Sequence, residues 1–155
     1  MSFRQARLDA GHTPKVLEKV VAPMAAFTKG ALLLDVAGVW TECGADPAVI
    51  GAVAQSDYLA DVTGFSHTAR TEFPPGSMQG MLVRDGVRFL AEKVLVGIDP
   101  VVGSEYGVIL DTDGRWKIDT GEAVATRVHV HRAVDDPIVQ NVWEVSFLAA
   151  NCQNL

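Results

Sequence analysis

Three features of the sequence predict an all-β protein, or a mainly β protein with one or two short helices. The phrase Leu-Asp-x-x-Gly-x-Trp begins at Leu34 and recurs at Leu110, and each copy lies between two aliphatic runs. Residues 127–132 and 141–148 alternate between apolar and polar side chains, as strands do. No segment carries a sustained apolar stripe at helical spacing. The repeated phrase predicts two related β-rich halves, each a small barrel or sandwich.

The composition sets the general class of the protein. A chain of 155 residues that is 48% hydrophobic can bury a core as one domain or two small ones. A formal net charge of -6 without a Lys/Arg cluster argues against a nucleic-acid partner. No apolar run approaches the roughly 20 residues of a membrane span, and residues 1–10 lack the apolar centre of a secretory signal. We therefore expect synthesis in the cytoplasm and no membrane partner.

The N-terminal segment is expected to be an arm followed by an extended stretch. Residues 1–14 mix charged and small side chains and show no sustained apolar period, which is typical of terminal segments that a partner fixes. Pro14 and Pro23 closely bracket residues 15–21, which favours an extended segment over a helix.

The first β-rich subdomain is predicted over residues 15–64. Residues 31–35 and 39–42 read as strands around a turn at Val36, Ala37 and Gly38. Residues 48–54 read as a strand of small side chains, in which Gly51 indicates a bulge or a close backbone approach. Residues 65–80 are irregular and are expected to be a linker between the halves or a long functional loop.

The second β-rich subdomain is predicted over residues 81–155. The Asp85-Gly86 pair predicts a hairpin spanning residues 81–90, and Asp113-Gly114 predicts another. Alternation places Val128 and Val130 on one face of a strand, opposite Arg127, His129 and His131. In the last strand Trp143, Val145 and Phe147 are expected to share a face.

Two groups of residues could bind a metal ion, but each also has a structural explanation. His129 and His131 have a spacing that can chelate zinc or copper, but the neighbouring Arg127 and Arg132 favour a solvated strand face or a subunit contact. Asp111, Asp113 and Glu122 match positions 1, 3 and 12 of a calcium loop, yet Arg115 and Trp116 occupy positions 5 and 6, so a hairpin turn explains them better.

The cysteines and tryptophans also have structural interpretations. Cys43 and Cys152 are too few for a disulfide scaffold, so two idle thiols are favoured over a bridge. Trp40 and Trp116 are expected to pack in the core, with a ligand platform as the alternative. The motifs of serine hydrolases, dinucleotide-binding folds and P-loops are all missing from the sequence. We predict a non-enzymatic protein with no cofactor and no metal.

One set of motifs resembles a known family. The chain has an N-terminal segment ending at Thr13-Pro14, Phe27-x-x-Gly30 before the aliphatic run 32–34, a turn and strand around residues 38–40, and the small-residue run 50–54. This pattern resembles the decoration proteins, also called head-stabilising or cement proteins, that tailed bacteriophages add to their capsids. The resemblance covers mainly residues 13–57, with a fainter echo at 101–136. It implies a β-tulip-like fold in the first half, while the second half departs from the smallest members.

The resemblance also implies a function and its contact residues. Such a protein binds the outside of the capsid at junctions between major capsid subunits, as a trimer or sometimes a dimer, and stabilises the shell. It would be made in the host cytoplasm and end on the outer surface of the virion. The expected capsid contacts in the arm are Arg4, Arg7, His12, Thr13, Pro14, Lys15, Val16 and Leu17. The expected contacts in the irregular loop, to another subunit or to the capsid, are Phe65, His67, Phe73, Pro74 and Pro75.

Two alternatives stay open at this point. The chain could be a β-domain of a phage tail or fibre, which assembly into a ring or fibre would reveal. It could instead be a small-molecule or carbohydrate-binding β-domain that uses Trp40, Trp116 or Trp143.

Overall fold

The structure is a computed structural model that describes residues 3–8, 15–21, 25–60, 66–68, 77–84, 86–134 and 141–155. Within these residues the protein is all-β, as predicted, with a single 3-10 turn at Ala149–Asn151 and no α-helix. No helix in this part of the chain is long and apolar enough to cross a membrane. The strands are β1 (Arg4–Leu8), β2 (Val16–Val21), β3 (Ala26–Phe27), β4 (Leu32–Val36), β5 (Val39–Glu42), β6 (Ala52–Ala54), β7 (Tyr58–Ala60), β8 (Ser66–Thr68), β9 (Ser77–Leu82), β10 (Val87–Glu92), β11 (Glu105–Leu110), β12 (Trp116–Asp119), β13 (Val128–Val134) and β14 (Val142–Phe147).

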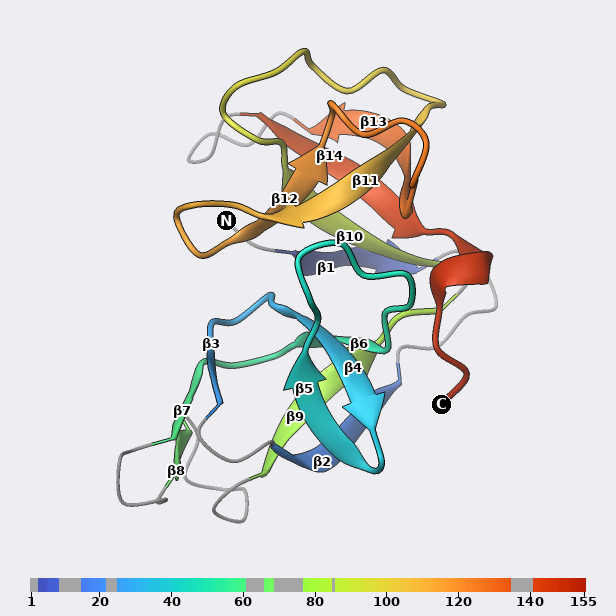
Figure 1. Cartoon of the computed structure of the whole chain (residues 1–155). Helices are drawn as coiled ribbons and strands as arrows, with labels where there is room; N and C mark the ends of the chain where they lie inside the picture. Colours follow the sequence, from blue (N-terminus) through green and yellow to red (C-terminus); the bar gives the residue numbers. More distant parts are fainter. Residues whose placement is uncertain are drawn as a thin grey trace.

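The strands form two main bodies, which Figure 1 shows one above the other. The lower body is a closed barrel with the strand order β2-β5-β4-β6-β9. The upper body is a curled sheet with the order β1-β10-β14-β13-β11-β12, which we call the half-barrel. Strands β3, β7 and β8 form a small sheet beside the closed barrel.

The two bodies repeat the same topology. In the closed barrel β4 lies between β5 and β6, and in the half-barrel β11 lies between β12 and β13. In the closed barrel β6 is followed by β9 and then β2, and in the half-barrel β13 is followed by β14 and then β10. The closed barrel is completed by parallel pairing of β2 with β5, and in the half-barrel a single parallel bridge joins Lys93, just after β10, to Ile118 on β12. The prediction of two related β-rich halves is confirmed.

Strand β1 keeps the second body open. The edge of β10 that would face β12 in a closed barrel is paired instead with β1, in antiparallel register from Arg4–Leu90 to Leu8–Val87. Only beyond that stretch does the chain reach β12, where the Val94 N–H donates to the Ile118 carbonyl at 3.1 Å. The described parts of the N-terminal segment, β1 and β2, are extended, as expected. The expectation of a free arm is corrected for residues 4–8, because their backbone groups are used in the sheet.

The two copies of the repeated phrase both form hairpins, with different turns. Strands β4 and β5 are joined by Ala37 and Gly38, with φ of 52° and 85°, which is the backbone of a tight two-residue hairpin turn. Strands β11 and β12 are joined by a longer loop, in which Gly114 has φ of 76° and its N–H donates to the Asp111 carbonyl at 2.9 Å. Both turns are confirmed.

The hairpin predicted at Asp85-Gly86 is wrong. Gly86 does have a positive φ of 77°, and the Val87 N–H donates to the Arg84 carbonyl at 3.3 Å, so a tight turn is present there. However, β9 pairs with β2 and β6 in the closed barrel, whereas β10 pairs with β1 and β14 in the half-barrel. The Asp-Gly pair favours a tight turn at this point of the chain. Which strands then pair with β9 and β10 is determined by the barrel that each of them joins. Strand β9 begins within residues 65–80, so the chain passes from one barrel to the other between Leu82 and Val87.

Large aromatic side chains fill both bodies. Trp40 is fully buried in the closed barrel, where a Cβ added to Gly80 would lie 3.0 Å from its Cζ2 atom. Trp116 is fully buried in the half-barrel, and Phe147 packs between Phe3 and Phe89 at ring-centroid distances of 5.1 and 5.4 Å. Val128 and Val130 are buried and alternate with half-buried His129 and His131, which confirms the predicted faces of β13; Trp143, Val145 and Phe147 are buried too, but so are Val142 and Glu144 on the opposite face of β14. The core role of the tryptophans is confirmed, and none of the three offers an exposed platform.

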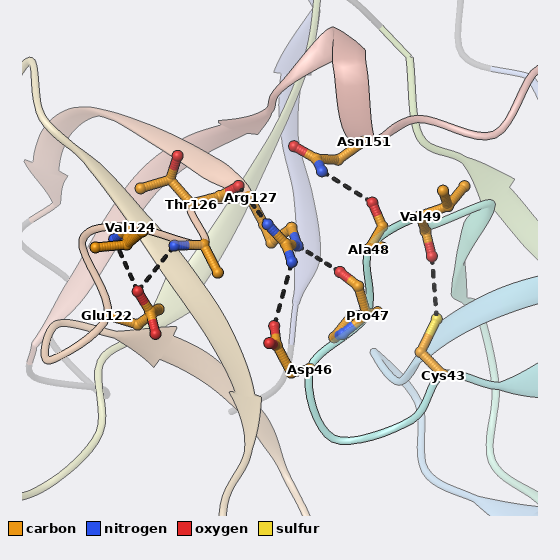
Figure 2. Close-up of polar contacts among 11 residues, drawn as sticks. Cys43, Asp46, Pro47, Ala48, Val49, Glu122, Val124, Thr126, Arg127 and Asn151 are labelled. Atoms are coloured by element: carbon orange, nitrogen blue, oxygen red, sulfur yellow. Dashed lines mark hydrogen bonds and ion pairs between the residues drawn. The ribbon is translucent and has the colours of Figure 1, made fainter.

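Side chains from each body bind the other. The Arg127 guanidinium donates to the Pro47 carbonyl and lies 3.4 Å from an Asp46 carboxylate oxygen (Figure 2). Asn151 donates to the Ala48 carbonyl at 2.8 Å in the same region. The indole N–H of Trp116 donates to Glu42 Oε1 at 2.9 Å. This bond joins the start of β12 in the half-barrel to the end of β5 in the closed barrel. These contacts fix the two bodies to each other.

The segment after β14 reinforces this connection. The Gln153 side-chain amide both accepts from the Asp35 N–H and donates to the Asp35 carbonyl, each at 2.9 Å. The Gln153 N–H donates to the Ile50 carbonyl at 2.8 Å. A Cβ added to Gly51 would lie 2.6 Å from Gln153 Oε1, which confirms the close backbone approach expected at this glycine. The segment thus adds to the wall of the closed barrel.

Candidate functional site

The outer wall of the closed barrel carries a row of valines. Val20 on β2 pairs with Val39 on β5, and Val39 pairs with Val36 on β4. Cross-strand partners point to the same side of a sheet, and their sequence neighbours Val21 and Trp40 are buried inside, so the row faces outward. Val20 is 58% exposed, Val36 50% and Val16, on the same strand as Val20, 41%. We call Val16, Val20, Val36 and Val39 the valine face.

An ion pair inside the barrel end supports this face. Lys19 binds Asp35, and its ammonium lies 5.3 Å from the centroid of the Trp40 ring. The pKa of Asp35 is held below its ordinary value, chiefly because Lys19 donates a hydrogen bond to it, while burial opposes this shift. The same carboxylate accepts the Gly38 N–H at 2.8 Å. Strand β2 and the β4–β5 hairpin are therefore held in one fixed arrangement beneath the valines.

The structure divides the contact residues expected in the arm between the two bodies. Lys15 is exposed directly before β2, and Val16 and Leu17 begin β2 on the closed barrel. Arg4 is exposed on β1 of the half-barrel, where Arg7 pairs with Arg88 in the sheet. His12, Thr13 and Pro14 lie outside the described residues. Val16 is the expected contact that coincides with an exposed apolar surface.

Most of the contact residues expected in the irregular loop are not among the residues that the structure describes. Phe65, Phe73, Pro74 and Pro75 lie outside the described residues. His67 lies on β8, where it pairs with Leu59 of β7 in the small three-stranded sheet.

A second apolar surface lies in the connection between β10 and β11, at residues 94–103, which we call the apolar loop. Leu95, Val96 and Ile98 are 83%, 92% and 66% exposed, and Val101 and Val102 are each 57% exposed. Figure 1 shows this loop at the top of the half-barrel, at the opposite end of the molecule from β2. None of the contact residues expected from the sequence lies in this loop. The sequence signal for this surface is its six aliphatic residues between two strands, because such a run is normally buried.

The apolar loop is held in shape by polar contacts. The Lys93 ammonium donates to the Gly97 carbonyl at 2.8 Å and pairs with Asp99 at 3.1 Å. The Val101 N–H donates to the Tyr106 hydroxyl at 3.0 Å. Gly97 has φ of 154°, and a Cβ there would lie 2.6 Å from Thr120 Oγ1, so the loop lies tightly against the end of β12. The aliphatic side chains are therefore presented on a fixed backbone.

The residues weighed as metal ligands make other contacts. His131 Nε2 lies 2.8 Å from Ser146 Oγ, and its ring packs against that of His129 at 4.8 Å between centroids. In the described part of the chain, no group of three or more His, Cys, Asp or Glu side chains is arranged to hold a metal ion. Glu122, position 12 of the calcium pattern, instead accepts the N–H groups of Val124 and Ala125 (Figure 2).

The other two residues of the calcium pattern bind a lysine. The buried Lys117 ammonium lies 2.8 Å from Asp111 and 2.7 Å from Asp113. Burial lowers the pKa of Lys117, but the hydrogen bonds to the two carboxylates outweigh it and raise the pKa above its ordinary value. The pKa values of Asp111 and Asp113 are lowered, chiefly by the same hydrogen bonds. The pattern is a hairpin with its own internal cation.

Cys43 and Cys152 are free thiols, in agreement with the favoured interpretation. Burial, together with the nearby Glu42 charge, raises the pKa of the Cys43 thiol to about 12. A thiol that stays protonated in this way is a poor nucleophile and metal ligand.

Comparison with known proteins adds no relative: no family model, curated protein or solved structure matches the chain.

Proposed function

We propose that this chain is a non-enzymatic structural protein of a tailed-phage virion. It binds the outside of the capsid at junctions between major capsid subunits and stabilises the shell, as a homo-trimer or a dimer. It contacts the capsid through the valine face of the closed barrel.

The observation that carries the proposal is the position of the valine face in the chain. The segment that resembles decoration proteins, residues 13–57, supplies β2, β4, β5 and β6, which are four of the five strands of the closed barrel. All four valines of the face lie on these strands. Exposed apolar side chains that cluster on a rigid surface are typical of a protein contact.

The chemistry of such a contact is simple burial. Covering apolar surface contributes about 25 cal/mol for each Å² removed from water, so a few valines alone give a weak bond. A shell offers many equivalent junctions, and an oligomer that engages several of them binds far more tightly than one copy does. Weak sites with avidity suit a protein that is added to a finished shell.

The test is co-sedimentation of the purified protein with capsids of the phage whose genome carries this sequence. The variant Val20→Lys/Val36→Lys should lose most of its shell binding, because it places two ammonium groups where the capsid would need apolar contact. Both side chains are half-exposed, so the fold should tolerate lysine there.

Val124→Lys is the matched control. Val124 is 94% exposed in the connection between β12 and β13 of the half-barrel, whereas the valine face lies on the closed barrel, so its change should leave binding to shells unaltered. Equal binding by the double variant and the control would refute the valine face as the contact. Failure of the unaltered protein to sediment with capsids would refute the proposed function itself.

A further inference from the structure

The molecule has a groove beside the segment that follows β14. Its volume is about 500 Å³, within the ~300–1,000 Å³ of sites that enclose organic groups. The lining residues are Val83, Arg84, Ala149, Cys152, Gln153, Asn154 and Leu155. The apolar members come from the chain directly after β9 and from the segment after β14, and Arg84 is the charged side chain among these residues.

The side chains that line the groove do not fill it, and one of them, Arg84, can donate hydrogen bonds to a ligand. Gln153 is turned away to the Asp35 backbone, and the Cys152 thiol donates to the Leu148 carbonyl at 3.4 Å. Arg84 donates one Nη2 hydrogen bond to the Leu155 carbonyl at 2.7 Å. A guanidinium has five N–H donors, so this bond leaves donor capacity at the groove.

The apolar loop has the complementary chemistry. Its tip is aliphatic, with Leu95 and Val96 almost fully exposed. Its rim carries two ion-paired carboxylates: Asp99, which is 74% exposed and pairs with Lys93, and Asp113, which is 42% exposed and pairs with the buried Lys117 beside Leu95. An apolar centre with a charged rim is the usual anatomy of a protein contact. The groove offers a mixed lining in which the apolar Ala149 and Leu155 lie with the Arg84 guanidinium.

We propose that the apolar loop of one copy of this chain docks into the groove of a second copy. Leu95 and Val96 enter the groove, and Asp99 reaches Arg84. The contact is head-to-tail, because the loop and the groove are different surfaces of the molecule. Repeating such a contact around an axis gives a closed ring, such as a trimer. The inference is independent of the proposed capsid binding, which uses the valine face.

A mixing experiment tests this arrangement. Val96→Asp places a charge at the apolar tip of the loop and leaves the groove intact. Ala149→Arg fills the groove and leaves the loop intact. Both sites are exposed, and the side chains replaced make no hydrogen bonds, so both variants should fold. Light scattering during size-exclusion chromatography gives the mass of each sample, and circular dichroism checks the fold.

The head-to-tail contact predicts three results. The unaltered protein forms oligomers, and each single variant self-associates at least about tenfold more weakly, because a charge or a bulky cation meets an apolar surface. An equimolar mixture of the two variants forms dimers and nothing larger, since only one intact loop and one intact groove remain to meet. Arg84→Glu should behave as Ala149→Arg does, and Val124→Asp should behave as the unaltered protein does.

The contrary results are equally distinct. A monomeric unaltered protein, single variants that remain oligomeric, or a mixture that stays monomeric would each overturn the proposal. None of these results depends on capsid binding, which is measured separately with shells.

Discussion

At the scale of single residues, the closed barrel depends on the fit between Trp40 and Gly80. The indole occupies the barrel interior, and the missing side chain at residue 80 gives it room against Ala52 on the neighbouring strand. Lys19 and Asp35 then cover the same ring at the barrel end. The position of Trp40 therefore couples the packing inside the barrel to the valine face on its outside.

Gly80→Ala should destabilise the protein by about 1 to 3 kcal/mol, the usual cost of overpacking a filled core. A Cβ at this position would lie 2.8 Å from the Ala52 Cβ, and neither atom can move without shifting a strand. Urea denaturation followed by tryptophan fluorescence measures the change. Gly44→Ala is the control, because nothing lies within 4 Å of its Cβ position. Equal midpoints for both variants would show that the indole does not fill the barrel as described.

At the scale of elements, β1 determines the difference between the two bodies. Both have the same five-strand topology, but β1 takes the edge of β10 and leaves a single bridge between Lys93 and Ile118. Phe3, directly before β1, is 1% exposed and contacts Phe147. Phe3 thus belongs to the core of the half-barrel, and β1 belongs to its sheet.

Deleting residues 1–8 should lower the free energy of unfolding by at least the ~3–5 kcal/mol typical of removing one buried phenylalanine. The deletion also exposes the edge of β10, which favours strand pairing between molecules. Phe3→Ala alone should show the burial part of this loss without the free edge. A deletion variant with an unchanged unfolding midpoint would restore the interpretation of this segment as a free arm.

Strands and turns were predictable where a short stretch of sequence determines them. Alternation identified the buried face of β13, and the glycines identified the turns at Gly38 and Gly114. Pairing between distant segments was not predictable in this way. The Asp85-Gly86 turn gave no sign that its flanking strands join different barrels, because that choice depends on β2 and β6 closing around β9. The pairing of β1 with β10 depends on an open edge that only the folded half-barrel provides.

The candidate surfaces were predictable in part for the same reason. Val16 was expected from its place near the arm, but the valine face needs the register that brings Val20, Val39 and Val36 into one row. No contact was predicted in the apolar loop, because aliphatic residues between strands are normally buried. Exposure depends on the brace from Lys93 and on the close fit at Gly97, which are tertiary contacts.

At the scale of the whole molecule, the doubled scaffold separates two apolar surfaces. The valine face lies on the closed barrel and the apolar loop lies at the far end of the half-barrel (Figure 1). Trp116, Arg127 and Gln153 hold the two bodies together, so the surfaces keep a fixed relation. One end can then attach to a shell while the other contacts a neighbouring copy.

A cryo-EM difference map between capsids with and without this protein tests the central claim most directly. The account predicts added density outside the shell at junctions between major capsid subunits, with the closed barrel nearest the shell and the half-barrel pointing outward. Added density in which the half-barrel's apolar loop faces the shell, or no added density on the outer surface, would contradict it.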